Sequence, residues 1–136
     1  DIAHLSLETG RLDVATALWM LYHTPDPDAA LAECRRVVRA GGLFIAATNS
    51  DAHLADLKRD AVITSERLPF SSENGATLLA RHFTSVDRID LTTRAHFVDH
   101  ASAVAYLATM GYDTTRLAPW QGPRDYAGHV TIFACS

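Results

Sequence analysis

Long apolar runs are missing from the sequence: no stretch approaches the roughly 20 residues that a helix needs to span a bilayer. The first residues also lack the basic and apolar regions of a signal peptide. We therefore expect neither a membrane partner nor export. The hydrophobic content of 48% over 136 residues is ordinary for one globular domain or part of one.

An excess of basic residues is absent as well. Twelve Lys and Arg stand against 16 Asp and Glu, which leaves a formal net charge of −4. Such a balance provides no positive field for phosphate backbones, so nucleic acid is disfavoured as the main partner. A small-molecule substrate fits the composition better.

Cysteine is scarce, and the histidines lack metal-ligand spacing. Cys34 falls on the apolar face of an expected helix and Cys135 lies at the chain end, so both are expected to be buried free thiols in a reducing cytoplasm. His96 and His100 are four residues apart, but the expected helix begins only at Asp99 or His100, so they do not form the helical i, i+4 pair of a zinc site. His23 with the acidic turn that follows it shows neither that pair nor a Cys/His ligand spacing. We therefore expect no metal.

Two catalytic signatures are also absent. The seven glycines are scattered, with only Gly41 and Gly42 adjacent, and no G-x-G-x-G turn occurs. There is no G-x-S-x-G motif, which argues against an α/β hydrolase.

What the sequence does contain is one βαβ unit over residues 11–50. An almost unbroken apolar run over 12–21 indicates a central parallel strand covered on both faces. Asp26 can cap a helix that begins near Pro27, and apolar residues then recur at three- and four-residue spacing. Gly41-Gly42 is expected to end this helix, and residues 43–47 to form the second strand.

The rest of the chain alternates shorter helices and strands. The first two expected elements are a helix that carries Leu54, Leu57 and Ala61 and is capped from 48–51, and a helix after Ser72 that bears residues 76–83. An edge strand over 83–91 follows, and then a helix that runs from Asp99 or His100 to Gly111. The chain is expected to close with a long loop over 112–128 and a last strand over 129–134.

An ordered set of short motifs resembles one family. Leu12-Asp13-Val14, Leu21-Tyr22-His23, Pro25-Asp26-Pro27 and Arg36-Val37-Val38-Arg39-Ala40-Gly41-Gly42 follow each other as in the middle of class I S-adenosylmethionine-dependent methyltransferases. The resemblance implies an α/β, partial Rossmann-like methyltransferase fold with a mostly parallel sheet of about four strands and flanking helices. It also implies that residues 1–136 are the C-terminal part of a single methyltransferase domain, whose glycine-rich cofactor loop is missing from this chain.

The same resemblance suggests site residues. For cofactor binding it points to Asp1, Ile2, Leu18, Trp19 and His23, with His23 as the one candidate for an optional catalytic base; for substrate binding it points to Asn49. Trp120 and Tyr126 are further candidates for substrate binding, because they lie in the long loop over 112–128. Purely structural roles remain open: His23 as a turn histidine, Trp19 as a core residue, and Trp120 and Tyr126 as anchors of the long loop.

We therefore expect S-adenosylmethionine-dependent methyl transfer to a small-molecule acceptor by a longer enzyme, with this chain inactive alone. The alternative is a non-enzymatic α/β binding or dimerisation module. Without the missing half, the strand over 12–21 becomes an apolar edge that carries only Asp13 as a charge. A homodimer formed through that edge is expected for the chain as given.

Overall fold

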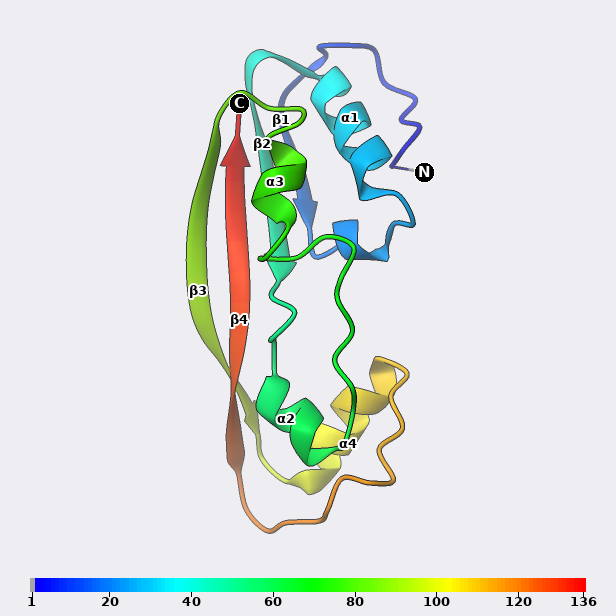
Figure 1. Cartoon of the computed structure of the whole chain (residues 1–136), viewed down its shortest axis with the longest axis vertical. Helices are drawn as coiled ribbons and strands as arrows, with labels where there is room; N and C mark the ends of the chain where they lie inside the picture. Colours follow the sequence, from blue (N-terminus) through cyan, green and yellow to red (C-terminus); the bar gives the residue numbers. More distant parts are fainter. Residues whose placement is uncertain (1) are drawn as a thin grey trace. The chain divides into compact units, whose positions relative to one another are not determined.

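A computed structural model describes residues 2–136. The strands β1 (Leu12–Leu18), β2 (Val38–Asn49), β3 (Val86–Phe97) and β4 (Arg124–Cys135) form one sheet in the order β1-β2-β4-β3 (Figure 1). The helices are α1 (Pro27–Val37), α2 (Ala55–Asp60), α3 (Gly75–Leu79) and α4 (His100–Thr109), with a short 3-10 turn, η1 (Leu21–His23). The α/β class is as expected.

The sheet is mixed, so the expectation of a mostly parallel sheet is corrected. β1 pairs parallel with β2, as the helical crossover through α1 requires, whereas β2 pairs antiparallel with β4. Periodicity reports which strands are buried but carries no information on strand direction, which explains the error.

The described chain divides into two compact units, each with its own core. Unit 1 holds residues up to Asp51 together with Arg67–Leu91 and Val130–Ser136; unit 2 holds Ala52–Glu66 and Thr92–His129. The residues of β3 and β4 are therefore shared between the two units.

The start of α1 is as expected, because the Asp26 carboxylate accepts a hydrogen bond from the Ala29 amide at 3.0 Å and Pro27 occupies the first turn. Its end is not. Val38 is already extended, and the two glycines lie inside β2.

The expected glycine stop is instead an irregularity in strand pairing. Leu12 pairs with Val38 but Val14 pairs with Leu43, so extra residues of β2 bulge out between these two pairs. Gly41 has a left-handed backbone, with φ of 71°. The predicted helix end was wrong because a bulge and a helix C-terminus demand the same glycine conformation.

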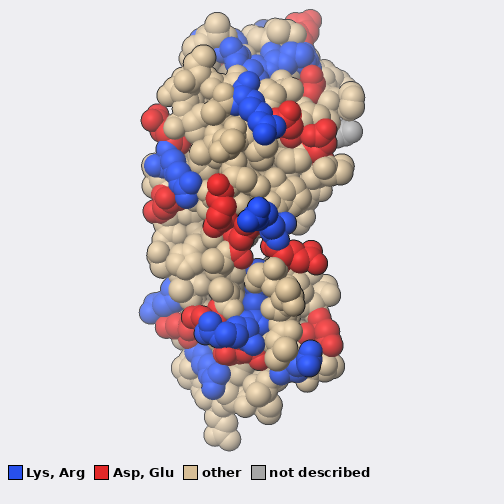
Figure 2. Space-filling model, viewed as in Figure 1, with Lys and Arg blue, Asp and Glu red and all other residues tan. Residues whose placement is uncertain are grey.

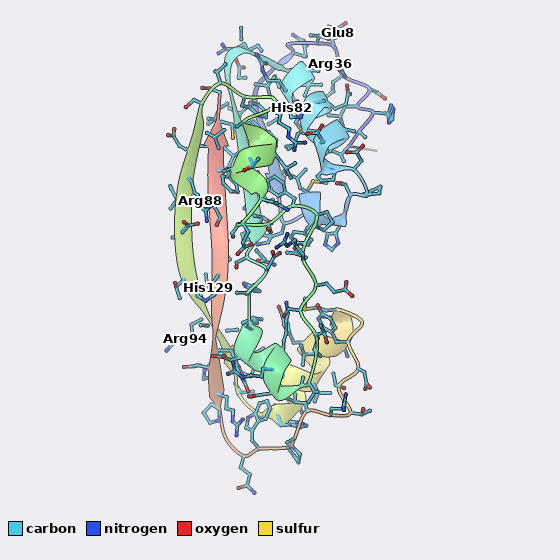
Figure 3. The ribbon with its side chains drawn as sticks, viewed as in Figure 1. Glu8, Arg36, His82, Arg88, Arg94 and His129 are labelled. Atoms are coloured by element: carbon cyan, nitrogen blue, oxygen red, sulfur yellow. The ribbon has the colours of Figure 1, made fainter. Side chains whose placement is uncertain are left out.

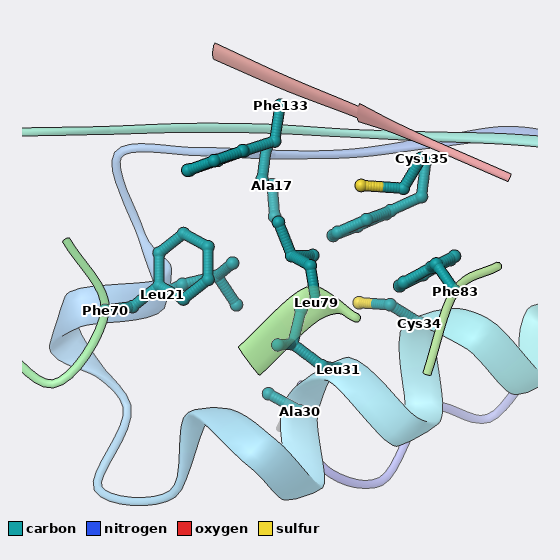
Figure 4. Close-up of a cluster of buried hydrophobic side chains, with 12 residues drawn as sticks. Ala17, Leu21, Ala30, Leu31, Cys34, Phe70, Leu79, Phe83, Phe133 and Cys135 are labelled. Carbon is teal, nitrogen blue, oxygen red and sulfur yellow. The ribbon is translucent and has the colours of Figure 1, made fainter. Parts of the chain in front are cut away.

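The core of unit 1 lies on one face of the sheet (Figure 4). α1 contributes Leu31, α3 contributes Leu79, and β4 contributes Phe133, all fully buried. Phe44 of β2 stacks on Phe83 with ring centroids 5.2 Å apart. Large apolar side chains from four elements therefore hold α1 and α3 against the β1, β2 and β4 strands.

The opposite face of β1 is open, so the expectation of a strand covered on both faces is corrected. Ala15 and Ala17 point toward the core, while Val14 and Leu18, on the alternate face, are each 50% exposed. β1 is also the last strand at its end of the sheet, as expected for the chain as given, and it ends at Leu18 rather than at residue 21.

Unit 2 is built around α2, α4 and the aromatic residues of β3 and β4, with Leu57, Leu107, Phe97 and Tyr126 in its core. α4 begins with a capping box between Asp99 and Ser102, as the sequence indicates.

Two expected boundaries in this part of the chain are corrected. α2 begins after Leu54, which has a left-handed backbone, rather than from a cap within residues 48–51, because the Thr48 hydroxyl already donates to the Phe70 carbonyl. β4 begins at Arg124 rather than at residue 129, so part of the expected loop is strand.

No helix within residues 2–136 is both long enough and apolar enough to cross a membrane. On the face drawn in Figure 2, basic and acidic side chains are interspersed rather than segregated.

Candidate functional site

The site lies where the parallel strands β1 and β2 end. Leu18 is the last residue of β1 and pairs with Ala47, and the Trp19 amide donates to the Ala47 carbonyl at 2.9 Å. The Trp19 indole Nε1 donates to Asn49 Oδ1 at 3.2 Å. The carboxyl ends of parallel strands are where open α/β sheets place their ligands. Three of the predicted residues, Leu18, Trp19 and Asn49, are therefore brought together at this edge.

Trp19 has an unusual backbone for a bulky residue. Its φ is 51°, in the left-handed region, which costs roughly 1–3 kcal/mol when the surrounding structure enforces it. The side chain remains 46% exposed. The alternative of a core tryptophan is therefore not what the structure shows.

His23 closes the η1 turn after this edge. Its side chain is exposed, its backbone amide donates to the Met20 carbonyl at 3.0 Å, and its ring lies 4.4 Å from the Tyr22 ring. Ile2 is partly buried against the unit 1 core. Asp1, the predicted adenine contact, lies outside the described residues.

A chain of polar side chains behind this edge, with Thr131 and Ser72 buried and Asp90 exposed, was missed by sequence reasoning. Thr131 Oγ1 lies 2.7 Å from Ser72 Oγ and 2.6 Å from Asp90 Oδ1. A hydroxyl has one hydrogen, so Ser72 donates to Thr131 and Thr131 donates to Asp90. This bond from Thr131, with a second from Arg88, lowers the pKa of Asp90. The three residues come from separate segments, and no motif links them.

A carboxylate also stands directly beyond β2. Glu73 Oε1 accepts from Ser50 Oγ at 2.6 Å, and Oε2 accepts from the Asp51 amide at 3.0 Å. Burial acts to raise the pKa of Glu73, but the hydrogen bonds from Ser50, Asp51 and Ser71 outweigh it and lower the pKa below its ordinary value. Glu73 is therefore ionised at neutral pH.

The other two predicted substrate residues lie in unit 2. Tyr126 is buried in β4, and its hydroxyl donates to Asp60 Oδ2 at 2.9 Å. Trp120 donates through Nε1 to the Gly122 carbonyl at 3.1 Å, while the Arg124 guanidinium lies over its ring at 4.5 Å. Both aromatic residues thus have structural partners within their own unit.

Other reactive groups add little chemistry. Burial raises the pKa of both Cys34 and Cys135 to about 11, so these free thiols stay protonated at neutral pH. Within residues 2–136, no group of three or more His, Cys, Asp or Glu side chains is placed to hold a metal ion.

The side chains at the end of β1 and β2 suit part of S-adenosylmethionine. Leu18 and Trp19 offer apolar and aromatic surface for its carbon chain or ring system, and Asn49 offers an amide for polar groups. The sequence contains no glycine-rich turn to approach the methionine end.

Comparisons with known proteins agree with this fold. A family model described as a methyltransferase domain matches residues 1–46. A curated relative, an uncharacterised 37.1 kDa protein in transposon TN4556 of Streptomyces fradiae, is 49% identical over 45 residues, which are 33% of this chain and 13% of that protein.

Solved structures match over nearly the whole chain. They include a putative methyltransferase from Bacillus halodurans (TM-score 0.64, 13% identity, 98% of this chain and 68% of that one) and YcgJ from Bacillus subtilis (TM-score 0.62, 12% identity, 98% and 67%). A third is a SAM-dependent methyltransferase from Thermotoga maritima, titled a possible histamine N-methyltransferase (TM-score 0.57, 16% identity, 98% and 60%). The chain thus spans about two thirds of these structures and a small part of the curated relative.

The fold is the α/β fold of these methyltransferase structures, and residues 1–46 match a methyltransferase domain. The resemblance to class I S-adenosylmethionine-dependent methyltransferases is confirmed, with the sequence match confined to residues 1–46. The comparisons support S-adenosylmethionine as the cofactor: the Thermotoga protein is titled SAM-dependent, and a Haemonchus contortus phosphoethanolamine methyltransferase structure contains S-adenosylhomocysteine.

Proposed function

We propose that this chain supplies the β1–β2 edge of a site for methyl transfer from S-adenosylmethionine to a small-molecule acceptor, in a reducing cytoplasm. The observation that carries the proposal is the Trp19–Asn49 pair at the joint carboxyl end of the two parallel strands. Two structural neighbours support a small acceptor, because their titles name histamine and phosphomonomethylethanolamine.

The cofactor, when bound, supplies an activated methyl group, and the chain supplies position. Catalysis of this kind rests mainly on proximity and orientation. Leu18 and Trp19 would cover apolar parts of the ligand and exclude water from them, while Asn49 holds the indole in place. Where the acceptor needs to lose a proton, His23 is the residue of this edge that can accept it.

A titration of the chain with S-adenosylhomocysteine, followed by ¹H–¹⁵N spectra, tests the proposal. Shifts are expected at the Trp19 indole N–H and the amides of Leu18 and His23, while the Trp120 indole N–H in unit 2 serves as the internal reference. Because the sequence offers no glycine-rich turn, the affinity should be weaker than micromolar. The proposal fails if millimolar ligand leaves all the named resonances of unit 1 unmoved.

A second candidate function is self-association, and the open edge of β1 favours it. β1 ends the sheet order with Val14 and Leu18 half exposed, and residues 12–18 contain no Lys, Pro or Gly to discourage pairing. The one charge, Asp13, is already paired with Arg39 at 2.6 Å. We therefore commit to a second copy of the chain as the occupant, in a two-fold dimer that pairs β1 with its copy.

Light scattering after size-exclusion chromatography should give about twice the 14.8 kDa monomer mass, and Val14→Lys should return it to the monomer. Leu7→Lys is the matched control, since Leu7 is also exposed but lies outside the strand. A monomeric wild-type chain at high concentration rules this candidate out.

A further inference from the structure

The backbone at Trp19 turns its side chain away from the core. Ala15 and Ala17 face the unit 1 core, so a strand that continued unchanged would direct residue 19 to the same side. The left-handed φ of 51° interrupts that alternation, and the indole is left 46% exposed. The structure thus holds a large aromatic side chain outside the core at a cost in backbone strain.

Asn49 fixes the indole without covering it. The bond from Nε1 to Asn49 Oδ1 lies along an N–H that projects in the plane of the ring, so neither ring face is used by it. Asn49 is itself held, because its carbonyl accepts from the Ser72 amide at 3.1 Å and it pairs with Val130 of β4. The result is an oriented aromatic surface at the strand ends.

Two carboxylates follow the strand end that carries Asn49. Asp51 lies two residues beyond Asn49, and its amide donates to the carboxylate of Glu73. The face of a tryptophan ring attracts cations through its quadrupole, and neighbouring negative charge adds to that attraction. An anionic ligand group is disfavoured by the same two carboxylates.

We infer that the Trp19 indole, oriented by Asn49, is a binding surface for an onium cation, either a sulfonium or a substituted ammonium. Toward the cation, Asn49 is then a positioning residue that acts through Trp19. This inference rests on the site of the proposed function and narrows it to a charged ligand group. The sulfonium of the cofactor and the ammonium of an amine acceptor share this chemistry.

Two matched ligand pairs test the inference on the Trp120→Phe chain, in which Trp19 is the single remaining tryptophan reporter. One pair is S-adenosylmethionine and S-adenosylhomocysteine, which lacks the sulfonium charge; the other is choline and its uncharged isostere 3,3-dimethylbutan-1-ol. Fluorescence titration should show the charged member of at least one pair binding about two- to five-fold more tightly, as expected for an exposed cation–π contact. The pair that discriminates identifies the source of the cation.

Asn49 variants then test the positioning role. Asn49→Asp keeps an acceptor for the indole N–H and should retain the preference for the charged ligand, whereas Asn49→Leu should reduce the ratio to about one. Equal affinities within both pairs overturn the inference, and so does an Asn49→Leu chain that keeps the wild-type ratio. If the Asn49→Leu chain does not fold, the ratio of affinities measured with Asn49 intact still decides whether Trp19 prefers the charged ligand.

The two proposals can fail separately. Equal binding of both adenosyl compounds at Trp19, with no choline preference, removes the cation surface but leaves the proposed function standing. Discrimination in the choline pair, with no response to either adenosyl compound, supports the cation surface but removes the proposed function.

Discussion

Alanine substitutions at Gly41 and Gly42 should have different costs, although the two glycines are adjacent. A Cβ built on Gly42 would lie 2.7 Å from Val38 Cγ1 and 2.8 Å from the Asp13 carbonyl oxygen. A Cβ on Gly41 would meet only the Arg39 side chain, at 3.8 Å, but its φ of 71° disfavours any side chain. The first glycine is therefore required for its backbone conformation and the second for space.

These geometries give different magnitudes. Alanine in the left-handed region costs about 1–2 kcal/mol, and the loss of glycine freedom in the unfolded chain returns about 0.4–1 kcal/mol, so Gly41→Ala should destabilise by roughly 0–1.6 kcal/mol. Overpacking costs about 1–3 kcal/mol, and a clash with backbone oxygen cannot relax by a rotamer change, so Gly42→Ala should lie near the upper end of that range and cost about 2 kcal/mol after the same return. Asparagine sharpens the contrast: it tolerates the left-handed region, so Gly41→Asn should cost less than Gly41→Ala, while Gly42→Asn should cost more than Gly42→Ala.

Thiol labelling in increasing urea measures the stability of unit 1 alone in each glycine variant. Cys34 and Cys135 are both buried in the unit 1 core, so a thiol reagent reaches them only when that core opens. A parallel transition by far-UV circular dichroism with an unchanged m-value checks that the variants alter stability rather than the unfolded state. If Gly42→Ala costs no more than Gly41→Ala, or if asparagine shifts both positions in the same direction, the steric account of the bulge is wrong.

Three further outcomes are expected. Arg36 (Figure 3) donates to the carbonyls of Leu5 and Leu7, so Arg36→Ala should accelerate amide exchange in residues 2–10 without comparable change elsewhere. Arg59→Ala removes another i, i+3 ion pair, an exposed one in α2, and should leave that segment protected. Hydrogen bonds from the Arg36 side chain and the Leu5 amide lower the pKa of Glu33 from 4.5 to about 2, so the stability that Glu33 contributes should be complete above pH 4.5 and be lost as the pH falls toward 2. Urea titrations across that pH range should show a weaker pH dependence of stability for Glu33→Gln than for the wild-type chain. An identical pH dependence contradicts the assignment. Tyr126→Phe removes the hydrogen bond to Asp60 and should lower the free energy of unfolding of unit 2 by about 0.5–1.5 kcal/mol. The fluorescence response of Trp19 to ligand should not change. A changed response would assign Tyr126 a role beyond the core of its own unit.

Local chemistry in the sequence was sufficient for several elements. Asp26 and Pro27 determine where α1 begins, and Asp99 determines where α4 begins, because a helix cap depends on neighbouring residues alone. The three- and four-residue spacing of apolar residues likewise indicated the helices that pack on the core. The ordered motifs of residues 12–42 were enough to suggest the family. The cofactor prediction followed from that resemblance, and the comparisons support it.

Other features depend on contacts between distant residues, and only the tertiary structure decided them. Gly41 and Gly42 read equally well as a helix stop or as a strand bulge until the partner strand, with Asp13 against Gly42, is in place. The antiparallel direction of β4 and the early start that places Tyr126 in a strand have no local signal. Trp19 and Asn49 were each predicted as site residues, but their bond joins positions 30 residues apart and requires the parallel pairing of β1 and β2. A one-dimensional pattern can identify which side chains are suited to a site, whereas their orientation is set by the strands that carry them.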